Sequence, residues 1–332
     1  MSERDRVIAK FLQDSSWGAA DCRPLAGDAS FRRYHRLTLG GRRAVLMDAP
    51  PPQEDVRPFL HIAGHLTALG YSAPRVEAAD STAGLLLLED LGDDTFTRLL
   101  AAGADEEVLY RLAVDLLIDL HGRGAAALPE GLPPYDDQRL LREVQVLTEW
   151  YYPEVMGAPL PDAARQDYVA LWRELLPVAR QVPETLVLFD FHVDNLLRLE
   201  GRRGVAACGL LDFQDAVAGP LTYDLMSLLE DARRDMDPAM VARLRQRYLE
   251  AFPGLERTAF DASWAAMAAQ RHSRVIGVFA RLNRRDGKPA YLRHIPRVWR
   301  LLETALAHPA LAALKDWLDR QLPPQRRVAP AP

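Results

Sequence analysis

Residues 186–225, LVLFDFHVDNLLRLEGRRGVAACGLLDFQDAVAGPLTYDL, carry the pattern that decides the fold of this chain. Asp190 is followed five residues later by Asn195, and Asp212 begins an Asp-Phe pair further along. In phosphoryl-transfer sites with this order, the first Asp accepts the proton of the attacking hydroxyl, and the Asn and the second Asp hold Mg²⁺. The segment therefore predicts a catalytic loop followed by a metal-binding strand end.

The residues around this polar set predict how it is held. Two short apolar runs, 186–189 and 208–211, are expected to form buried strands, and EGRRG at 200–204 is expected to form a turn. We expect these strands to form one hairpin that brings the three polar side chains to the same end, where their oxygen atoms suit Mg²⁺ carrying phosphate. A single acidic residue at a strand end is more often a solvated loop carboxylate, but the complete ordered set favours a kinase site.

The segment resembles the aminoglycoside phosphotransferase and choline kinase superfamily. Within it, DFHVDNLL and GLLDFQDAVAGPLTYDLMSLLED are similar to the bacterial anomeric kinases of N-acetylmuramate and N-acetylglucosamine that act in cell-wall recycling. The resemblance implies a bilobal, protein-kinase-like α+β fold, ATP and Mg²⁺ as cosubstrates, and phosphorylation of the C1 hydroxyl of the sugar. It implies Asp190 as the catalytic base, Asn195 and Asp212 as metal ligands, and Asp224 as a structural residue that braces the catalytic loop.

The N-terminal part departs from the kinase pattern. A kinase normally places a Lys on the third strand of the small lobe, against the α- and β-phosphates. The candidate strand here is 43–47, with Met47 or Asp48 at the Lys position. None of the three lysines of the chain, Lys10, Lys288 and Lys315, can occupy that position. Another group must therefore anchor the phosphates.

The segment LAGDASFRRYHRL at 25–37 is the expected substitute. A glycine followed by small residues lets backbone N–H groups approach a phosphate, and an arginine on the following strand can bind it bidentately. Glu54, expected at the start of a helix whose apolar stripe runs from Phe59 to Leu69, could pair with one of these arginines. An ordinary hairpin turn with solvated arginines explains the segment equally well. The candidate nucleotide contacts are Gly27, Ser30, Arg32, Arg33 and, as a further alternative, Arg36.

Four consecutive leucines at 85–88 predict a strand buried on both faces. Glu89, Asp90 and Leu91 follow and resemble the superfamily's hinge, whose backbone can bind adenine. Any buried strand that leaves a sheet has this pattern, so the pattern alone is not specific. The position of this segment between the two expected lobes supports the hinge interpretation. Glu89 and Leu91 are therefore candidate nucleotide-binding residues.

The C-terminal part is locally basic, with thirteen Lys or Arg against four Asp or Glu in 263–332. Arg271, Arg274, Arg281 and Arg285 fall on one face of a helix expected from about residue 263. A solvated basic face or a nucleic-acid patch would give the same pattern. In the superfamily that the chain resembles, this region binds the phosphoryl acceptor, and a basic wall suits an anionic acceptor. The candidate acceptor residues are Arg271, Arg274, Arg281, Asn283, Asp286 and Tyr291.

Composition is typical of a globular enzyme. The chain has 332 residues with a formal net charge of −5 and two cysteines. It contains no apolar run of membrane-spanning length and no signal-peptide pattern at its start, so we expect a cytoplasmic protein that binds neither membrane nor nucleic acid. We expect a monomer whose partner is a small amino-sugar substrate.

The expected organisation is a nucleotide-binding lobe over 1–90, a catalytic and acceptor-binding lobe over 91–322, and a disordered tail over 323–332. Helices from about Pro238, N-capped by Asp237, are expected to shape the acceptor pocket. Other functions remain open. The missing Lys is compatible with a non-catalytic nucleotide-binding pseudokinase, and the acceptor could be another amino sugar, an aminoglycoside or a choline-like alcohol. A nucleic-acid binder is disfavoured by the net charge and the absence of a recognition motif.

Overall fold

The computed structural model describes residues 2–25 and 31–331, so the predicted contacts Gly27 and Ser30 lie outside the described residues. The chain forms two compact units. One comprises Met1–Leu116 with Val193–Ala216, and the other comprises Leu117–His192 with Val217–Pro332. The boundary predicted near residue 90 divides the chain by function and stays a prediction. By packing, the segment around Asn195 and Asp212 belongs with the N-terminal sheet.

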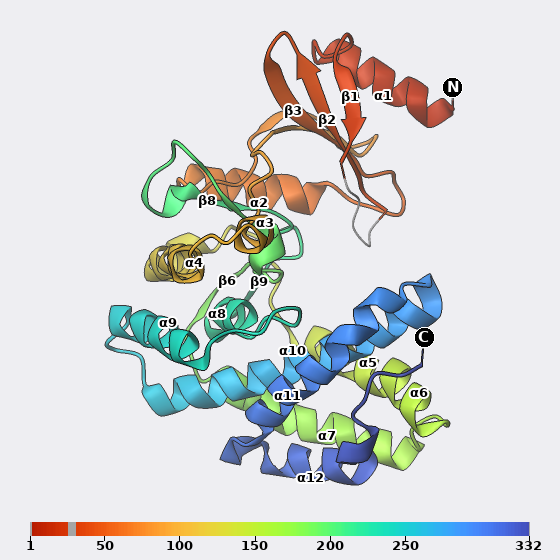
Figure 1. The fold of residues 1–332 in the computed structure, drawn as a ribbon, viewed down its shortest axis with the longest axis vertical. Coiled ribbons are helices and arrows are strands. Elements are labelled where there is room, and N and C mark those ends of the chain that lie inside the picture. Colours follow the sequence, from red (N-terminus) through yellow and green to blue (C-terminus); the bar gives the residue numbers. More distant parts are fainter. Residues whose placement is uncertain (1, 26–30, 332) are drawn as a thin grey trace. The chain divides into compact units, whose positions relative to one another are not determined.

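The first unit is built on a five-stranded sheet of order β1-β2-β3-β5-β4 whose pairs are all antiparallel (Figure 1). The predicted leucine strand is β5, in the interior of the sheet, and all four leucines are buried. Helix α1 covers one face, where Phe11 and Trp17 pack on Leu37, Leu46 and Leu87. The elements are α1 (Glu3–Asp14), β1 (Asp21–Pro24), β2 (Arg33–Leu39), β3 (Arg42–Asp48), α2 (Arg57–Ala68), β4 (Val76–Asp80), β5 (Leu85–Glu89), α3 (Phe96–Ala101), the first part of α4 (Glu106–Gly122), η3 (Val193–Asn195), β7 (Leu196–Arg198), η4 (Gly204–Ala207) and β8 (Cys208–Leu210).

The second unit is mainly helical, with one two-stranded ribbon of β6 and β9. Its central element is α10, a helix of 30 residues that contacts α5, α7, α8 and α11. Glu256 caps its first turn, and Gly287, with a φ of 63°, ends it in the left-handed conformation. The predicted cap is also confirmed, because the Asp237 side chain accepts the N–H of Ala239 at the start of α9. The elements are η1 (Gly124–Ala127), α5 (Asp137–Val146), η2 (Leu147–Tyr151), α6 (Tyr152–Met156), α7 (Asp162–Ala179), β6 (Glu184–Val187), β9 (Val217–Pro220), α8 (Thr222–Leu229), α9 (Pro238–Ala251), α10 (Arg257–Asp286), η5 (Pro289–His294), α11 (Ile295–Leu306), η6 (Pro309–Leu311), α12 (Ala312–Gln321) and η7 (Pro324–Arg326).

Together these elements confirm the α+β class, with an antiparallel sheet in the N-terminal part and helices in most of the remainder. Within the described ranges, no helix is both long enough and apolar enough to cross a membrane.

The pairing of the short strands differs from the prediction. The two apolar runs were expected to pair with each other, but β6 pairs with β9, and β8 pairs with β7. The single expected hairpin is therefore two separate ribbons. The turn at 200–204 is present, and it joins β7 to β8 through η4.

Helix α10 passes very close to the junction of α5 and η2. A Cβ atom placed on Gly277 would lie 2.4 Å from the backbone carbonyl atoms of Val146 and 2.5 Å from the backbone N of Leu147. These neighbours are backbone atoms, which cannot rotate away as a flexible side chain can. Only glycine therefore fits this crossing without displacing a helix.

Disorder was predicted for 323–332, but the described residues of this tail make specific contacts with other elements of the second unit. The Arg327 guanidinium pairs with Glu303 and Asp319 and lies 5.2 Å from the centre of the Trp299 ring system. The Tyr151 hydroxyl donates to the carbonyl oxygens of Arg326 and Val328. These contacts hold a segment whose proline-rich composition alone suggests disorder.

Candidate active site

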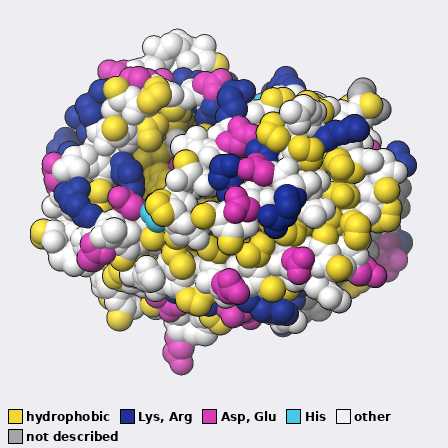
Figure 2. Space-filling model, turned by 90° about the horizontal axis from the view of Figure 1, so that it is seen from below, with side chains coloured by type: hydrophobic (Ala, Val, Ile, Leu, Met, Phe, Trp, Pro, Cys, Tyr) yellow, Lys and Arg dark blue, Asp and Glu magenta, His cyan; other side chains and the backbone are white. Residues whose placement is uncertain are grey.

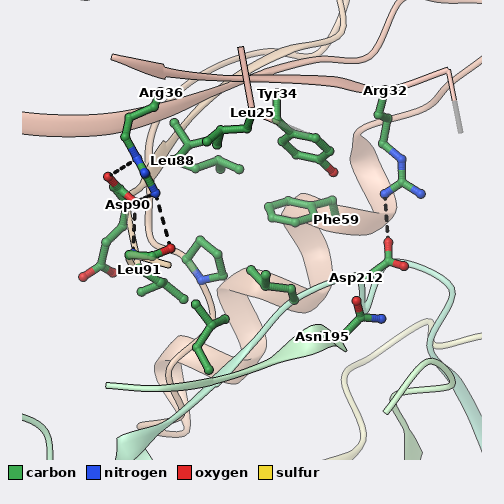
Figure 3. Close-up of a pocket in the computed structure, with 16 residues that line it drawn as sticks. Leu25, Arg32, Tyr34, Arg36, Phe59, Leu88, Asp90, Leu91, Asn195 and Asp212 are labelled. Carbon is green, nitrogen blue, oxygen red and sulfur yellow. Dashed lines mark hydrogen bonds and ion pairs between the residues drawn. The ribbon is translucent and has the colours of Figure 1, made fainter. Parts of the chain in front are cut away.

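A cavity of about 280 Å³ opens in the first unit, beside β2, β3 and the residues that follow β5 (Figure 3). Its walls are largely apolar, with Leu25, Val45 and Leu88 from the sheet side and Leu197 and Leu211 from the β7–β8 ribbon. An apolar slot of this kind suits a flat heteroaromatic base. Polar side chains lie at both ends, with Arg36 and Asp90 at one and Arg32, Asn195 and Asp212 at the other (Figure 3).

Arg32 occupies the polar end that carries Asp212. Its Nε lies 3.5 Å from a carboxylate oxygen of Glu54, and its Nη1 lies 3.4 Å from Oδ1 of Asp212. The predicted pairing of Glu54 with an arginine is confirmed, although Glu54 precedes α2 and does not begin it. Arg32 thus holds a guanidinium between two carboxylates, where a phosphate can replace one of them as a partner.

The third strand provides no cation to this cavity. Val45 of β3 lines it, and Met47, two residues on, is buried with 1% exposure. Asp48 is buried and pairs with Arg4 of α1. The prediction that no Lys takes this position is confirmed. Arg33, a predicted nucleotide contact, is exposed and does not line the cavity, because alternation along β2 sends it to the opposite side from Arg32.

Asn195 and Asp212 lie at the same end of the β7–β8 ribbon. The N–H of Leu211 donates to the Asn195 carbonyl at 2.9 Å, which fixes the two residues in register. Asp212 has a φ of 58°, a left-handed conformation that is uncommon for a residue with a side chain and often marks functional sites. The next residue, Phe213, stacks on Phe59 of α2 at 5.0 Å between ring centres and anchors this turn.

Asn195 and Asp212 suit a magnesium ion that is also coordinated by ligands from outside the protein. An Asn and an Asp oxygen are hard donors of the kind Mg²⁺ prefers. Among the described residues, no cluster of three or more His, Cys, Asp or Glu could hold a metal ion by itself. A magnesium ion here would therefore complete its coordination with phosphate oxygens and water, as in other phosphoryl-transfer sites.

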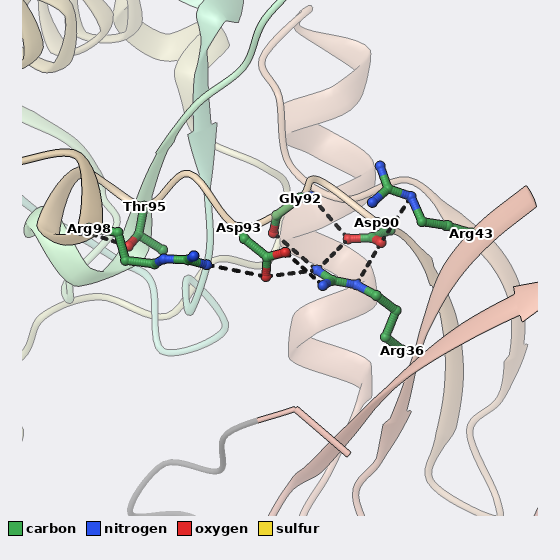
Figure 4. A network of polar contacts seen from close by, with 7 residues as sticks. All are labelled: Arg36, Arg43, Asp90, Gly92, Asp93, Thr95 and Arg98. Atoms are coloured by element: carbon green, nitrogen blue, oxygen red, sulfur yellow. Dashed lines mark hydrogen bonds and ion pairs between the residues drawn. The ribbon is translucent and has the colours of Figure 1, made fainter. Parts of the chain in front are cut away.

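The residues after β5 form a charged network at the opposite end of the cavity (Figure 4). Arg36 binds Asp90 with Nε at 2.8 Å and Nη2 at 3.0 Å, and it also pairs with Asp93 at 2.8 Å. Arg36 is thus engaged here and does not serve as the alternative phosphate contact. The Glu89 carboxylate pairs with Arg202 at 2.5 Å. The acidic side chains of this hinge are held by protein partners, and Leu91 lines the cavity, where it can face a base.

The predicted catalytic loop belongs to the second unit. It begins after β6, and Asp190 follows Phe189, whose φ is 75°. The buried Asp224 accepts the N–H of Leu188 at 2.5 Å and the N–H of Phe189 at 3.0 Å. Asp224 therefore contacts the backbone of the residues that deliver Asp190, as the resemblance implied. Burial raises the pKa of Asp224 to about 7, against the opposing effect of these two hydrogen bonds.

The predicted basic face of α10 divides into a buried part and an exposed part. Arg271 is 4% exposed, and its Nη1 is buried without a hydrogen-bond partner in the part of the chain that the structure describes. Arg274 is partly buried, and its Nη1 donates to the Tyr223 hydroxyl at 3.4 Å. Arg285 is exposed and pairs with Asp286 at 2.7 Å. The solvated-face interpretation is therefore wrong for Arg271 and correct for Arg285.

Electrostatic effects link Arg271 and Arg274 to the predicted catalytic loop. Burial, and after it the charges of Arg233 and Arg271, lower the pKa of His192, two residues beyond Asp190. Burial opposes the charge of Arg274, but nearby groups that include Asp190 raise its pKa above the ordinary value. A buried cation without a bonded carboxylate is costly, and it suits an anionic or oxygen-rich ligand.

The other predicted acceptor residues have fewer features that suit an acceptor contact than Arg271 and Arg274. Asn283 donates to the carbonyl of Ala331 at 3.5 Å, and Tyr291 stacks on Phe279 at 5.4 Å. Arg281 is partly buried, and Asp286 is engaged by Arg285 as described. On the face shown in Figure 2, basic and acidic side chains are interspersed and form no continuous basic field.

Sequence reasoning missed Arg139, which lies on α5 and contacts the ring of Phe189. No motif marks it, because its position beside the catalytic loop depends on how α5 packs. Sequence reasoning also missed that Asp90 is the bonded partner of Arg36. An acidic residue directly after an apolar strand was the available signal for that pair.

Comparison with known proteins gives one consistent result. Residues 21–260 match the phosphotransferase enzyme family. An N-acetylmuramate/N-acetylglucosamine kinase of Caulobacter vibrioides is 39% identical over 98% of this chain and 99% of its own length. A protein of the same name from Pseudomonas aeruginosa is 39% identical over 95% of this chain and 93% of its own length.

Solved structures show the same fold at much lower sequence identity. A choline/ethanolamine kinase family protein from Mesorhizobium loti aligns with a TM-score of 0.62 and 14% identity, over 95% of this chain and 99% of its own. The GDP complex of aminoglycoside 2'-phosphotransferase-IIIa aligns with a TM-score of 0.60 and 16% identity, over 92% of this chain and 99% of its own.

Proposed function

The chain belongs to the phosphotransferase enzyme family, and from this premise we propose that it transfers the γ-phosphoryl group of ATP to the anomeric hydroxyl of N-acetylmuramate or N-acetylglucosamine. The observation that carries the proposal is the placement of Asp190 on a loop whose backbone is held by buried Asp224. Relatives at 35–39% identity that are named as kinases of these two sugars support the choice of acceptor. The product would be an amino-sugar 1-phosphate, a form in which cell-wall sugars can be reused. Since ATP is the donor, we place the reaction in the cytoplasm.

The first unit would bind the nucleotide. The apolar cavity accepts the base against Leu88 and Leu197, and the phosphates extend toward Arg32. Asn195 and Asp212 would hold Mg²⁺, which supplies charge neutralisation on the phosphates when it is bound. Arg32 contributes a second positive charge at this end, in place of the absent Lys.

In the second unit, Asp190 orients the acceptor hydroxyl and accepts its proton as the oxygen attacks the γ-phosphorus. An anomeric hydroxyl is more acidic than an ordinary alcohol, which eases this proton transfer. Arg271 and Arg274 are the proposed acceptor contacts, because Arg271 is buried, Arg274 is partly buried, and neither is bonded to a carboxylate in the described chain.

A panel assay tests this function. ATP consumption is measured with N-acetylmuramate, N-acetylglucosamine, glucosamine, an aminoglycoside and choline, and ³¹P NMR identifies the product. We expect turnover with the first two sugars and an anomeric phosphate signal. Turnover with only an aminoglycoside or choline would assign a different acceptor, and nucleotide binding without any turnover would identify a pseudokinase.

Arg32→Ala is expected to weaken ATP binding. A hydrogen bond to a charged group contributes about 1.5–3 kcal/mol, which corresponds to a loss of roughly tenfold to a hundredfold in affinity. Calorimetric titration with ATP and Mg²⁺ measures the affinity. Arg33→Ala is the matched control, because Arg33 is the neighbouring, exposed arginine on the other side of β2. Equal ATP affinity in Arg32→Ala and the parent would exclude Arg32 as the phosphate anchor.

The buried arginines of α10 are expected to discriminate between the two sugars. N-acetylmuramate carries a lactyl carboxylate that N-acetylglucosamine lacks, and a guanidinium can bind it bidentately. Replacing the contacting residue, Arg271 or Arg274, with Ala should raise KM for N-acetylmuramate about tenfold or more and change that for N-acetylglucosamine little. Arg285→Ala, an exposed arginine on the same helix, should behave like the parent. An unchanged ratio of kcat/KM between the sugars in both buried variants would remove α10 as the carboxylate site.

A further inference from the structure

Phe189, the residue before Asp190, is held in a conformation that its own side chain disfavours. Its φ of 75° lies in the left-handed region, which is a genuine outlier for a bulky residue. The peptide that follows Phe189 leads directly into Asp190, so the backbone of Phe189 sets the direction of the catalytic carboxylate. Contacts that keep Phe189 in this conformation therefore control the position of Asp190.

The ring of Phe189 is enclosed by aromatic and cationic side chains. It stacks on Tyr223 with 5.4 Å between ring centres and an angle of 9°, and it forms a T-shaped contact with Tyr135 at 5.7 Å between ring centres. The guanidinium carbon of Arg139 lies 4.3 Å from the ring centre, and that of Arg274 lies 4.4 Å from it. Both distances are within the range of cation–π attraction, and the ring is buried with 2% exposure.

Arg139 is itself fixed by its neighbours. It pairs with Glu143, one turn further along α5, at 3.1 Å. Glu143 in turn accepts the Tyr135 hydroxyl at 2.5 Å and the side-chain amide of Gln270 at 2.9 Å. Arg139 therefore has a bonded anchor on one side and the Phe189 ring on the other.

Helix α10 reaches this cluster at two points. Gln270 binds Glu143, and Arg274, one turn further along, lies on the Phe189 ring and donates to the Tyr223 hydroxyl at 3.4 Å. The helix that carries the proposed acceptor arginines is thus bonded to the residues that hold the catalytic loop. Fixed contacts of this kind maintain the geometry on which proton transfer depends.

We propose that Arg139 is a positioning residue for Asp190, because its guanidinium holds the Phe189 ring while Glu143 holds the guanidinium. The proposal rests on the proposed function, in which Asp190 is the base. It assigns Arg139 no contact with the substrate. The charge of Arg139 is essential to the role, since a neutral side chain of similar length fills the space without attracting the ring or binding Glu143.

The test compares Arg139→Met with Arg139→Lys. Arg139→Met removes the charge, so kcat should fall about tenfold or more, since small displacements of a catalytic group have effects of this size. The KM values for ATP and sugar should stay within about twofold of the parent. Arg139→Lys retains a cation beside the ring and Glu143, and it should recover at least about a third of the parental kcat. Arg142→Met, at an exposed arginine of the same helix, is the control and should match the parent.

A second variant covers the case in which Arg139→Met does not fold. Glu143→Gln keeps the size of the anchor and removes its charge, and it should also lower kcat more than it changes KM. A parental kcat in Arg139→Met or in Glu143→Gln would overturn the proposal. Equal losses of kcat in Arg139→Met and Arg139→Lys, accompanied by the same fall in Tm, would also overturn it. Asp190→Asn, measured in parallel, separates this result from the proposed function: an active Asp190→Asn rejects Asp190 as the base, whatever Arg139 does.

Discussion

Asp190→Asn should lower turnover by roughly 10² or more and leave ATP binding close to that of the parent. The amide keeps the size and hydrogen-bonding shape of the carboxylate, but it cannot accept the proton of the sugar hydroxyl. The residues that line the proposed nucleotide cavity belong to the first unit, whereas Asp190 belongs to the second, so the variant removes no side chain from that cavity. The measurements are steady-state kcat and the calorimetric Kd for ATP with Mg²⁺.

Asp167→Asn provides the control for this experiment, because Asp167 is an exposed carboxylate on α7. It should show parental kcat, so that a loss in Asp190→Asn cannot come from a general change in charge. A near-parental kcat in Asp190→Asn would show that another group accepts the proton.

Asp224→Ala is expected to combine a loss of stability with a loss of turnover. The variant leaves the N–H groups of Leu188 and Phe189 without their acceptor, and each unsatisfied buried donor costs about 1–3 kcal/mol. The same two groups hold the backbone before Asp190, so kcat should fall along with Tm. Thermal unfolding and steady-state kinetics on one preparation measure both effects. A fall in Tm with parental kcat would limit Asp224 to a structural role.

The ionisation of Asp224 has a second measurable effect. Its pKa in the folded protein, about 7, is above its ordinary value of 3.8, so the folded state binds the proton more tightly. The contribution of this group to stability is therefore complete at low pH and is lost as pH rises from about 4 through about 7. Between pH 5 and pH 8, the parent should lose more stability than Asp224→Asn, whose side chain does not titrate. The opposite difference would show that the carboxylate, not the acid, is favoured in the folded protein.

The candidate catalytic and metal-binding residues could be proposed from the sequence because their signal is local. The spacing of Asp190 and Asn195, and the Asp-Phe pair at Asp212, is contained in one short segment and requires no knowledge of distant contacts. The buried leucine strand and the absence of a third-strand Lys could be inferred for the same reason. The role of Asp224 came from the resemblance, and the hydrogen bonds to Leu188 and Phe189 give it a physical basis.

Strand pairing could not be inferred in the same way. The run before Asp190 and the run before Asp212 are both apolar, and either could pair with several partners. The actual partner of β6 is β9, whose small residues Ala218 and Gly219 give a weak strand signal. Pairing is decided by which backbone edges become adjacent when the chain is packed, which periodicity along one strand does not report.

The spacing of the arginines along a strand or helix predicted only part of their environment in the structure. Alternation along β2 separates Arg32 from Arg33 once the strand is known, but it does not say which of them faces the cavity. Helical period grouped Arg271 with Arg285, although the first is buried and the second is exposed. Arg139 was not detectable, because its partner Phe189 lies far away in sequence and its function depends on that contact.

The close crossing at Gly277 limits how this enzyme can acquire new acceptors. A side chain at this position would meet the backbone at Val146 and Leu147, so α10 cannot be shifted sideways or rotated there without moving α5 as well. Arg271 and Arg274 lie within two turns of this contact, so their backbone positions are effectively constant. A change in sugar preference, natural or engineered, should therefore come from exchanging side chains on a fixed helix, and libraries for that purpose should leave residue 277 untouched.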